Sequence, residues 1–444
     1  MTESLNTEAY ELIKLISHKP KEIVKERVEL TGSTKERGFV DWSDKLVGAA
    51  VERTTDHIGN TIEIFLYDGN GSFGFNKSEY LKFNELIQKI HSIEQFNKLV
   101  SIGFIETESF NWIVDVYKNQ RAEFSLYDFL LASIDMKVKP FTFYFPVLNL
   151  EIEQPFKIGN VEFTYFTEAY FDELYKSLKE KDQTITEENY KQIFRKDFQG
   201  QVLAKVTITA EIDKAEETAK NHAEISVNVL KLYSDSAIVP EKKTMFDLNF
   251  KLGYQVQSNY LTQKQNEIGE LAISIEFNNS PFTFTQRHYS LANESGLKIF
   301  SNYISQSSNN ELHEIIIQSI HLFGSAISNR DLHLRCVNMI TIFESIFLKD
   351  DEDWKMEQKV IKRLAVALSN DQKEKEKIKT IVSNIYQVRH KMIHKAERLT
   401  IDVKELSEGQ MIMINLFLRL IYFNTQLGFK DKTTLIDELA KSES

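Results

Sequence analysis

The chain is nearly free of cysteine, because Cys336 is the only one among its 444 residues. A disulfide between two positions of the chain is therefore excluded, and such sparing use of cysteine is typical of a reducing cytoplasm. The N-terminus also lacks the basic segment followed by an apolar one that marks a secretory signal peptide. We therefore expect a cytoplasmic protein.

Long hydrophobic runs are missing as well. The most apolar stretch, Met411 to Phe423, is too short to span a bilayer and carries the polar residues Asn415 and Arg419. It predicts a buried helix, and we expect no membrane partner.

Familiar catalytic motifs are absent too. No G-x-S-x-G pattern occurs, and Cys336 lies among apolar neighbours in a predicted helix, where a thiol is usually inert. A literal G-x-G-x-x-G runs from Gly69 to Gly74. A dinucleotide site would also need a buried parallel strand after the next helix, and the residues following Ile93 do not supply one. We interpret the glycines as an ordinary turn.

Negative charge prevails, with a net charge of −11 that by itself disfavours a general nucleic-acid coat. The distribution is uneven, however. The segment from Trp354 to Lys395 contains eleven Lys or Arg residues and four Asp or Glu residues, which gives it a local charge of +7. This island is either a pair of lysine-rich solvated helices or the footprint of a polyanion, and charge alone does not decide between them.

Residues 1 to about 290 predict strands with inserted helices. The composition, 42% hydrophobic and 11% aromatic, is sufficient for a real core. Alternating patterns rich in β-branched and aromatic residues predict strands at 61–68, 141–152, 161–166, 201–212 and 271–277, with turns at 159–160 and 279–281. Helices are expected at 77–93 and 213–235, and the second has an apolar side wide enough to pack against two partners.

After residue 290 the chain changes character. Proline disappears, glycine becomes sparse, and apolar residues recur at helical spacing in five segments. These segments cover about 312–327, 334–348, 361–368, 378–393 and 409–427. Five amphipathic helices joined by short polar loops predict a compact helical bundle.

One stretch of this bundle, YQVRHKMIHKAE from Tyr386 to Glu397, concentrates basic side chains and two histidines. His390 and His394 are four residues apart and share a helix face, a spacing found in metal sites. A metal hydrolase would need a third ligand and nearby carboxylates, whereas the surrounding sequence is positive rather than acidic. The stretch can also be the plain polar face of a bundle helix.

A third interpretation is RNA cleavage without a metal, in which a ribose 2′-hydroxyl attacks its own phosphate. This chemistry needs a group that exchanges protons near neutrality, as histidine does, and a cation that matches phosphate, as arginine does. Arg389 and His394 have these properties. On a straight α-helix, however, five residues place the two roughly 140° apart.

The same stretch is similar to the R-x4-6-H motif of HEPN domains, with a four-residue spacer whose first member, His390, is polar. The preceding segments resemble the Apea-like HEPN branch. There a helix ending near an aspartate is followed by a helix with an internal glutamate (Glu344), a helix with an arginine (Arg363), and Tyr-x-x-Arg before the histidine. The resemblance covers roughly residues 309–427. The chain departs from many relatives at Lys395, where they have glycine.

The resemblance implies an α+β fold with two regions. Residues 1–290 would form a large β-rich N-terminal sensor or regulatory region, with room for two subdomains. Residues 291–444 would form an all-α Apea-like HEPN helical bundle. Arg389 and His394 would be the catalytic pair, and His390 would orient or assist them. We expect Lys391 and Lys395 to bind RNA, and we expect neither a metal nor another cofactor.

HEPN domains typically pair so that two motifs face one cleft, which implies a homodimer. Many are metal-independent endoribonucleases of toxin–antitoxin, abortive-infection and antiphage defence systems. We expect the N-terminal region to gate cleavage in response to a phage-derived or nucleic-acid trigger. Helix 213–235 would couple the regions, and Phe141 to Phe145 and Phe282 to Phe284 are candidate recognition aromatics. The alternative is an inactive HEPN module that only binds RNA or dimerises.

Overall fold

The computed structural model describes residues 2–20, 50–67, 71–119, 123–166, 198–242, 246–249, 257–262, 270–275, 281–306, 310–329 and 331–441, with scattered residues between 172 and 192. The chain divides into two compact units. The first comprises Met1–Phe141 and Ile208–Thr218, and the second comprises Thr142–Thr207 and Ala219–Ser444. The strands between residues 142 and 207 are thus grouped with the C-terminal helices, whereas the sequence changes character near residue 290.

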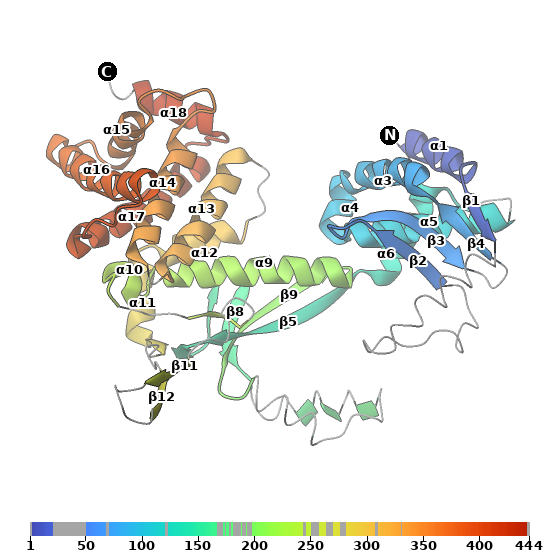
Figure 1. The fold of residues 1–444 in the computed structure, drawn as a ribbon, viewed down its shortest axis with the longest axis horizontal. Coiled ribbons are helices and arrows are strands. Elements are labelled where there is room, and N and C mark those ends of the chain that lie inside the picture. The colour runs from blue at the N-terminus through green and yellow to red at the C-terminus, as the bar shows by residue number, and fades with distance from the viewer. Residues whose placement is uncertain are drawn as a thin grey trace. The chain divides into compact units, whose positions relative to one another are not determined.

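The first unit combines an antiparallel sheet with helices (Figure 1). Its strand order is β1 (Ser17–Pro20), β4 (Gly71–Phe75), β3 (Thr61–Tyr67) and β2 (Ala50–Thr55). Its helices are α1 (Thr2–Ile13), α3 (Lys77–His91), α4 (Glu94–Leu99), α5 (Ile102–Asn119) and α6 (Leu126–Lys137). The strand expected at 61–68 and the helix expected at 77–93 are confirmed. Most described residues of this unit are nevertheless helical, so the expectation of a mainly β region is wrong here.

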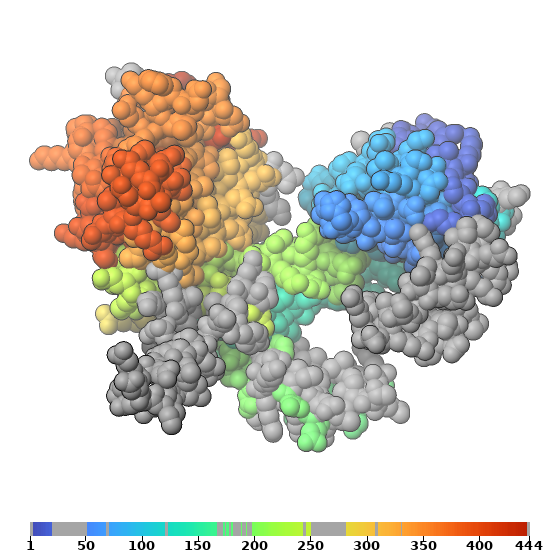
Figure 2. Space-filling model, in the orientation of Figure 1, coloured from blue at the N-terminus to red at the C-terminus, as the bar shows by residue number. Residues whose placement is uncertain are grey.

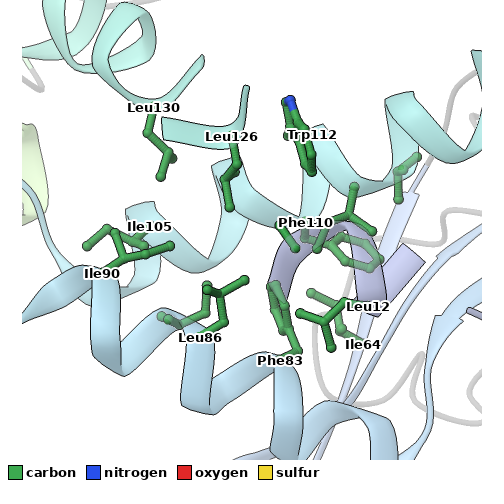
Figure 3. Close-up of a cluster of buried hydrophobic side chains, with 14 of the residues drawn as sticks. Leu12, Ile64, Phe83, Leu86, Ile90, Ile105, Phe110, Trp112, Leu126 and Leu130 are labelled. Atoms are coloured by element: carbon green, nitrogen blue, oxygen red, sulfur yellow. The ribbon is translucent and has the colours of Figure 1, made fainter. Parts of the chain in front are cut away.

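A single hydrophobic core joins this sheet to its helices. Figure 3 shows apolar side chains from α1, β3, α3, α5 and α6 converging on one volume, among them Leu12, Ile64, Phe83, Leu86, Ile90, Ile105, Phe110, Trp112, Leu126 and Leu130. Full burial of one such side chain stabilises the fold by about 1.5–3 kcal/mol. The helical spacing of these residues explains why Ile102–Asn119 and Leu126–Lys137 form helices rather than strands.

The last glycine of the pattern from Gly69 to Gly74 is explained by strand packing. Residues 68–70 lie outside the described residues, but β3 and β4 pair antiparallel, with Phe65 opposite Gly74. A Cβ atom at Gly74 would lie 2.0 Å from the carbonyl oxygen of Ile64. The next elements along the chain are helices α3, α4 and α5 rather than a parallel strand. The pattern is therefore not a dinucleotide fingerprint.

The second unit contains a five-stranded sheet. Its order is β10 (Asp247–Leu248), β5 (Lys139–Leu148), β9 (Val202–Ala210), β8 (Val161–Tyr165) and β7 (Phe156–Ile158). In addition, β6 (Leu150–Ile152) pairs parallel with β13 (Phe282–Phe284), and β11 (Gln257–Thr262) pairs antiparallel with β12 (Glu270–Ile275). The expected strands are all found, with shifted ends. The turn expected at 279–281 falls largely outside the described residues, because residues 276–280 are not among them.

Two details of these strands bear on the sequence-based expectations. Gly159 connects β7 to β8 with a φ of +59°, a left-handed conformation that glycine adopts without strain, so the turn expected there is confirmed. Phe282 and Phe284 are 5% and 2% exposed and therefore belong to the core. They cannot form the recognition surface for which they were candidates, because their rings do not reach solvent.

Helix α9 (Ile212–Lys231) connects the sheet of the second unit to its helices. On one side, the Ser226 hydroxyl donates to the carbonyl oxygen of Ile158 in β7 at 3.0 Å. On another, the Asn228 side chain is hydrogen-bonded to Nδ1 of His321 in α13 at 3.1 Å. Figure 1 shows α9 running along the strands beneath α12 and α13. The expectation that this helix packs against both sheet and bundle is confirmed.

The C-terminal helices are α11 (Gln286–Glu294), α12 (Leu297–Ile304), α13 (Glu311–Ile327), α14 (Leu332–Phe347), α15 (Met356–Leu368), α16 (Gln372–Lys395), α17 (Val403–Thr425) and α18 (Lys432–Lys441). The five expected helices are α13 to α17. Four of these begin at side chains that accept hydrogen bonds from first-turn amides, namely Asn310, Asp331, Asp371 and Asp402. On the face shown in Figure 2, side chains fill the spaces that separate the ribbons.

Several polar groups are buried where these helices meet α10 (Asp235–Ile238). Arg335 is 3% exposed, and Gln410 donates from Nε2 to the carbonyl oxygen of Ser236 at 3.0 Å. Burial lowers the pKa of Arg335 to about 10 and raises that of Cys336 to about 12. The thiol therefore stays protonated at neutral pH, in line with its expected inertness.

Within the described residues, no helix has both the length and the apolar character needed to cross a membrane.

Candidate functional site

A pocket of about 430 Å³ lies where α14, α15 and α16 meet. Its lining comprises Glu344 of α14, residues that precede and begin α15, and one side of the C-terminal part of α16: Glu344, Asp353, Lys355, Met356, Glu357, Gln358, Tyr386, Arg389, His390 and His394. The three residues predicted to be catalytic, Arg389, His390 and His394, therefore share one cavity.

Helix α16 presents these residues because its two halves differ. The first half buries apolar side chains in the bundle, ending with Ile385 and Tyr386. The remaining two and a half turns are mostly polar, and every residue in them is half-buried or exposed, so the rigid first half positions them. The helix is regular through Lys395 and ends at Ala396, whose φ is +52° and whose N–H donates to the carbonyl oxygen of Lys391. Lys395 is therefore helical, and Ala396, the residue after it, has the left-handed conformation.

The separation of Arg389 and His394 around the helix is overcome by the long arginine side chain. Nη2 of Arg389 lies 3.5 Å from Oε2 of Glu344, so the guanidinium reaches across to α14. This distance is long for a charge-assisted hydrogen bond, for which 2.7–2.9 Å is usual, and the contact is correspondingly weak. Among the described residues we find no other hydrogen bond or ion pair of Arg389. Most of its donors thus remain available to a ligand.

The two histidines lie side by side on the exposed part of α16. The ring centroids of His390 and His394 are 4.9 Å apart, with an angle of 47° between the ring planes. Both residues are exposed, so a substrate can reach them directly. In the part of the chain that the structure describes, no group of three or more His, Cys, Asp or Glu side chains is arranged to hold a metal ion.

Tyr386 closes the inner end of the pocket. It is 3% exposed. Burial, and then the carboxylates of Glu344 and Glu357, raise the pKa of the phenol far above its ordinary value. The hydroxyl is therefore neutral throughout the physiological range. Its oxygen is buried, and the phenol cannot serve as a base.

The charge of the pocket differs from that of the surrounding sequence. Three carboxylates, Glu344, Asp353 and Glu357, line it with two cations, Lys355 and Arg389. The expectation of a positive rather than acidic environment is therefore wrong for the cavity itself. The sequence signal misled because several lysines of the basic island point elsewhere. The first turn of α15 also lines the pocket, and a helix N-terminus contributes partial positive charge there.

The two lysines expected to bind RNA are not among the lining residues. Nζ of Lys391 lies 3.2 Å from Oε2 of Glu397, an ion pair at the end of α16. Lys395 is exposed in the last turn of that helix. Cations in this position also stabilise a helix through its dipole, so their presence has a structural explanation. Their contact with RNA stays a prediction.

The segment between α14 and α15 is fixed by a half-buried ion pair. Glu352 accepts from both terminal nitrogens of Arg363, at 2.5 Å and 2.7 Å, and the same guanidinium donates to the carbonyl oxygen of Phe347. The pair holds the pKa of Glu352 at about 2, well below its usual value. Arg363 thus acts structurally, and it positions Asp353 and Lys355 at the pocket.

Sequence reasoning did not assign Glu344 and Tyr386 to the site. Glu344 was noted only as an internal glutamate of its helix. It is a half-buried acid between the fully buried Phe343 and Phe347. An acidic residue interrupting an apolar helix face is a signal that sequence alone contains. Asp353, Lys355 and Glu357 carried no such signal, because they belong to a polar connection whose path depends on the Glu352–Arg363 pair.

Comparison of the chain with protein-family models, curated proteins and solved structures finds no match. The similarity of the Arg389–His394 stretch to HEPN domains therefore rests on the motif and its place in the bundle.

Proposed function

We propose that the chain is a metal-independent endoribonuclease of a prokaryotic antiphage or abortive-infection defence system, with Arg389, His390 and His394 at its active site. The observation that carries the proposal is that Arg389 and His394 line a single pocket although they lie on different sides of α16. A cation and an imidazole in one accessible cavity are the two groups that RNA transesterification requires.

The proposed reaction is an in-line displacement within the RNA. The ribose 2′-oxygen attacks the adjacent phosphorus, and the bond from phosphorus to the 5′-oxygen of the next nucleotide breaks. An imidazole accepts the proton of the 2′-hydroxyl, and a protonated imidazole supplies one to the leaving 5′-oxygen. The products are a 2′,3′-cyclic phosphate and a 5′-hydroxyl end. Arg389 stabilises the charge that develops on the phosphorane oxygens.

The neighbouring side chains have supporting roles in this proposal. His390 lies next to His394 and either orients it or supplies the second imidazole of the proton exchange. Glu344 orients the Arg389 guanidinium toward the pocket through its single contact.

The proposal includes a homodimer, because two-fold pairing would bring a second Arg389 and His394 to the same cleft. Mixing the Arg389→Ala and His394→Ala proteins tests this directly. If the cleft is shared, mixed dimers contain one intact arginine and one intact histidine, and cleavage recovers in part. Sedimentation of active wild-type protein as a monomer at the assay concentration would contradict the dimer.

We also assign a gating role to residues 1–290, responsive to a phage-derived or nucleic-acid trigger. An unrestrained ribonuclease endangers its own cell, and the described residues before 290 contribute nothing to the pocket. Helix α9 is the candidate coupling element, because Ser226 contacts β7 and Asn228 contacts α13. A trigger can change activity only if it binds the active and inactive arrangements with different affinity.

One observation favours a second candidate, an inactive module that binds RNA or dimerises. Three carboxylates line the pocket, and one of them already pairs with Arg389. If an RNA phosphate cannot displace Glu344 from Arg389, the site binds RNA weakly and does not cleave it. The two candidates differ in whether purified protein cuts RNA.

The deciding experiment incubates the purified full-length chain with total RNA, with and without EDTA. We expect cleavage that survives chelation and leaves cyclic-phosphate ends. Arg389→Ala and His394→Ala should abolish it, whereas Arg398→Ala and His57→Ala should not, because Arg398 pairs with Asp331 outside the pocket and His57 lies in the first unit. Loss of cleavage on chelation, restored by a divalent cation, would instead support metal-dependent hydrolysis.

A further inference from the structure

An exposed tryptophan stands beside the pocket. Trp354 is 72% exposed, and its two chain neighbours, Asp353 and Lys355, both line the cavity that contains Arg389 and His394. Large aromatic side chains normally bury most of their surface. By contrast, Trp112 of the first unit is 3% exposed. The indole of Trp354 is therefore available to bind a ligand.

The backbone on both sides of Trp354 is fixed. Two residues before it, Glu352 is held by Arg363 through two short contacts and by Lys359 at 3.2 Å. One residue after it, Lys355 adopts a left-handed conformation with a φ of +54° and starts α15. Trp354 is thus presented by a rigid segment, and little conformational entropy is lost when a ligand packs against its ring.

The charges around Trp354 indicate which part of a ligand it meets. Asp350 is paired with Lys432 at 2.8 Å, and Glu352 is paired with Arg363, whereas Asp353, which directly precedes Trp354, lines the pocket. Carboxylates repel the phosphates of a polyanion. They accept hydrogen bonds from the N–H groups of nucleobases. With Asp353 directly before it and Lys355 directly after it, Trp354 suits the base of a nucleotide whose phosphate lies toward the cations Lys355 and Arg389.

We infer that Trp354 is a stacking platform for one unpaired nucleobase of single-stranded RNA, next to the phosphate bound at Arg389. This inference rests on the proposed function and specifies its substrate class. In a duplex the faces of the bases are covered by their neighbours, so a duplex cannot use the platform. Stacking on an aromatic side chain tolerates any base, and selectivity is therefore for single strands rather than for a sequence.

A protein partner fits the surroundings less well. Stable protein interfaces need an extended patch of roughly 800 Å² on each partner with an apolar centre. Trp354 instead stands between charged residues, and Met356 is its nearest exposed apolar neighbour in sequence, at 41% exposure. A single aromatic ring among polar groups is the arrangement used to stack a base.

The test uses the full-length chain and a short single-stranded oligoribonucleotide whose 2′-hydroxyls are methylated, so that it cannot be cleaved. We expect this RNA to quench the tryptophan emission of the wild-type protein but not that of Trp354→Phe. By anisotropy of labelled RNA, Trp354→Ala should bind roughly 5- to 150-fold more weakly, the loss expected for one stacked base. Trp354→Phe, which retains an aromatic ring, should bind nearly as well as wild type.

Two controls separate stacking from other effects. Phe124→Ala removes another aromatic side chain, 60% exposed in the first unit, and should leave RNA binding unchanged. A duplex of the same sequence should not quench Trp354. Equal affinity of Trp354→Ala and wild type, without quenching, would overturn the inference. So would emission from Trp354 that shifts with protein concentration in the absence of RNA, since the indole would then contact a second copy.

The inference and the proposed function fail in different ways. If the protein binds the methylated RNA through Trp354 but never cuts an unmodified one, the stacking site stands and the nuclease does not. If Trp354→Ala cuts and binds RNA as wild type does, the nuclease stands and the stacking site is wrong.

Discussion

The two units of the chain use their polar side chains differently. Both units have polar side chains that cap the starts of helices, as Asn76 and Ser125 do for α3 and α6 in the first. Among the described residues, however, buried lysine and arginine side chains are found only in the second unit. Lys231 is 2% exposed and pairs with Asp247 at 2.6 Å, and Arg335 is also buried. Burying a charge is unfavourable unless it is fully paired, so each of these cases needs a reason.

Two arginines of the second unit show what the difference teaches. Arg363 makes two short contacts to Glu352 and one to a backbone carbonyl, so its donors are used within the fold. Arg389 makes one contact of 3.5 Å and borders a cavity. Arg363 is therefore typical of a structural residue, and Arg389 is typical of a residue that binds a ligand. We call Arg363 saturated, because its donors are bonded within the fold, and Arg389 unsaturated, because most of its donors are not. The following predictions test this contrast.

The largest effect is expected at the unsaturated arginine and its neighbouring histidine. Arg389→Ala and His394→Ala should each reduce RNA cleavage by roughly 10²–10⁴-fold, because each removes a group needed in the transition state. The midpoint of urea unfolding should stay close to that of wild type, since both side chains lie outside the core. Cleavage at the parental rate by both variants would refute the assignment.

In the first unit, the largest effect is expected at Gly74. Gly74→Ala places a methyl group against the backbone of β3 and should destabilise that unit by about 3 kcal/mol, as overpacking does. Thermal unfolding followed by circular dichroism measures this, with Gly103→Ala in helix α5 as the control, because a Cβ atom at Gly103 would meet no atom within 4 Å. If residues 1–290 restrain the nuclease, the variant should also cleave RNA without a trigger. Unchanged basal cleavage despite the lower stability would count against gating.

At the saturated arginine we expect a loss of stability that depends on pH. Glu352 has a pKa of about 2, below its unfolded value of 4.5, so its ionised form stabilises the fold above about pH 4.5. That contribution disappears as the pH falls toward 2. Glu352→Gln should therefore lower the free energy of unfolding by about 2 kcal/mol at neutral pH and by progressively less in acid. A difference from wild type that is constant between pH 7 and pH 3 would contradict the ion-pair explanation.

The smallest effect is expected at Glu344. Glu344→Gln keeps the shape of the side chain but removes its charge, so Arg389 loses its orienting partner. We expect about a tenfold fall in kcat with little change in KM, because the contact is single and long. A rise in RNA affinity with lower activity would indicate that Glu344 competes with phosphate, and a variant as active as wild type would exclude an orienting role.

The sequence predicted the helical part of the fold well. Helices α13 to α17 have apolar residues at regular spacing, and all of them except α15 have acidic or amide side chains at their starts; these signals are local. It predicted the first unit less well. There residues 94–137 were not assigned, because their aromatic and β-branched content resembles that of strands while their periodicity is helical. Helices α11, α12 and α18 were too short to produce a clear period.

The candidate site was predicted only along one helix. Arg389, His390 and His394 could be selected because their spacing and chemistry lie within a few residues of sequence. Their partners come from α14 and from the segment before α15, and only tertiary packing brings these together. The acidic character of the pocket was missed for the same reason, since local charge counts include lysines that face away from it.

The left-handed backbone at Lys355 and Ala396 has a consequence for how this protein can evolve. Lys355 lines the pocket and starts α15, and Ala396 ends α16 two residues after His394, the last lining residue of that helix. Adding or deleting one residue inside either helix would turn the pocket side chains by about 100° around its axis. Single-residue insertions and deletions should therefore be tolerated in the loop after Glu397 but not between Tyr386 and His394, and a library of such variants selected for activity should show that boundary.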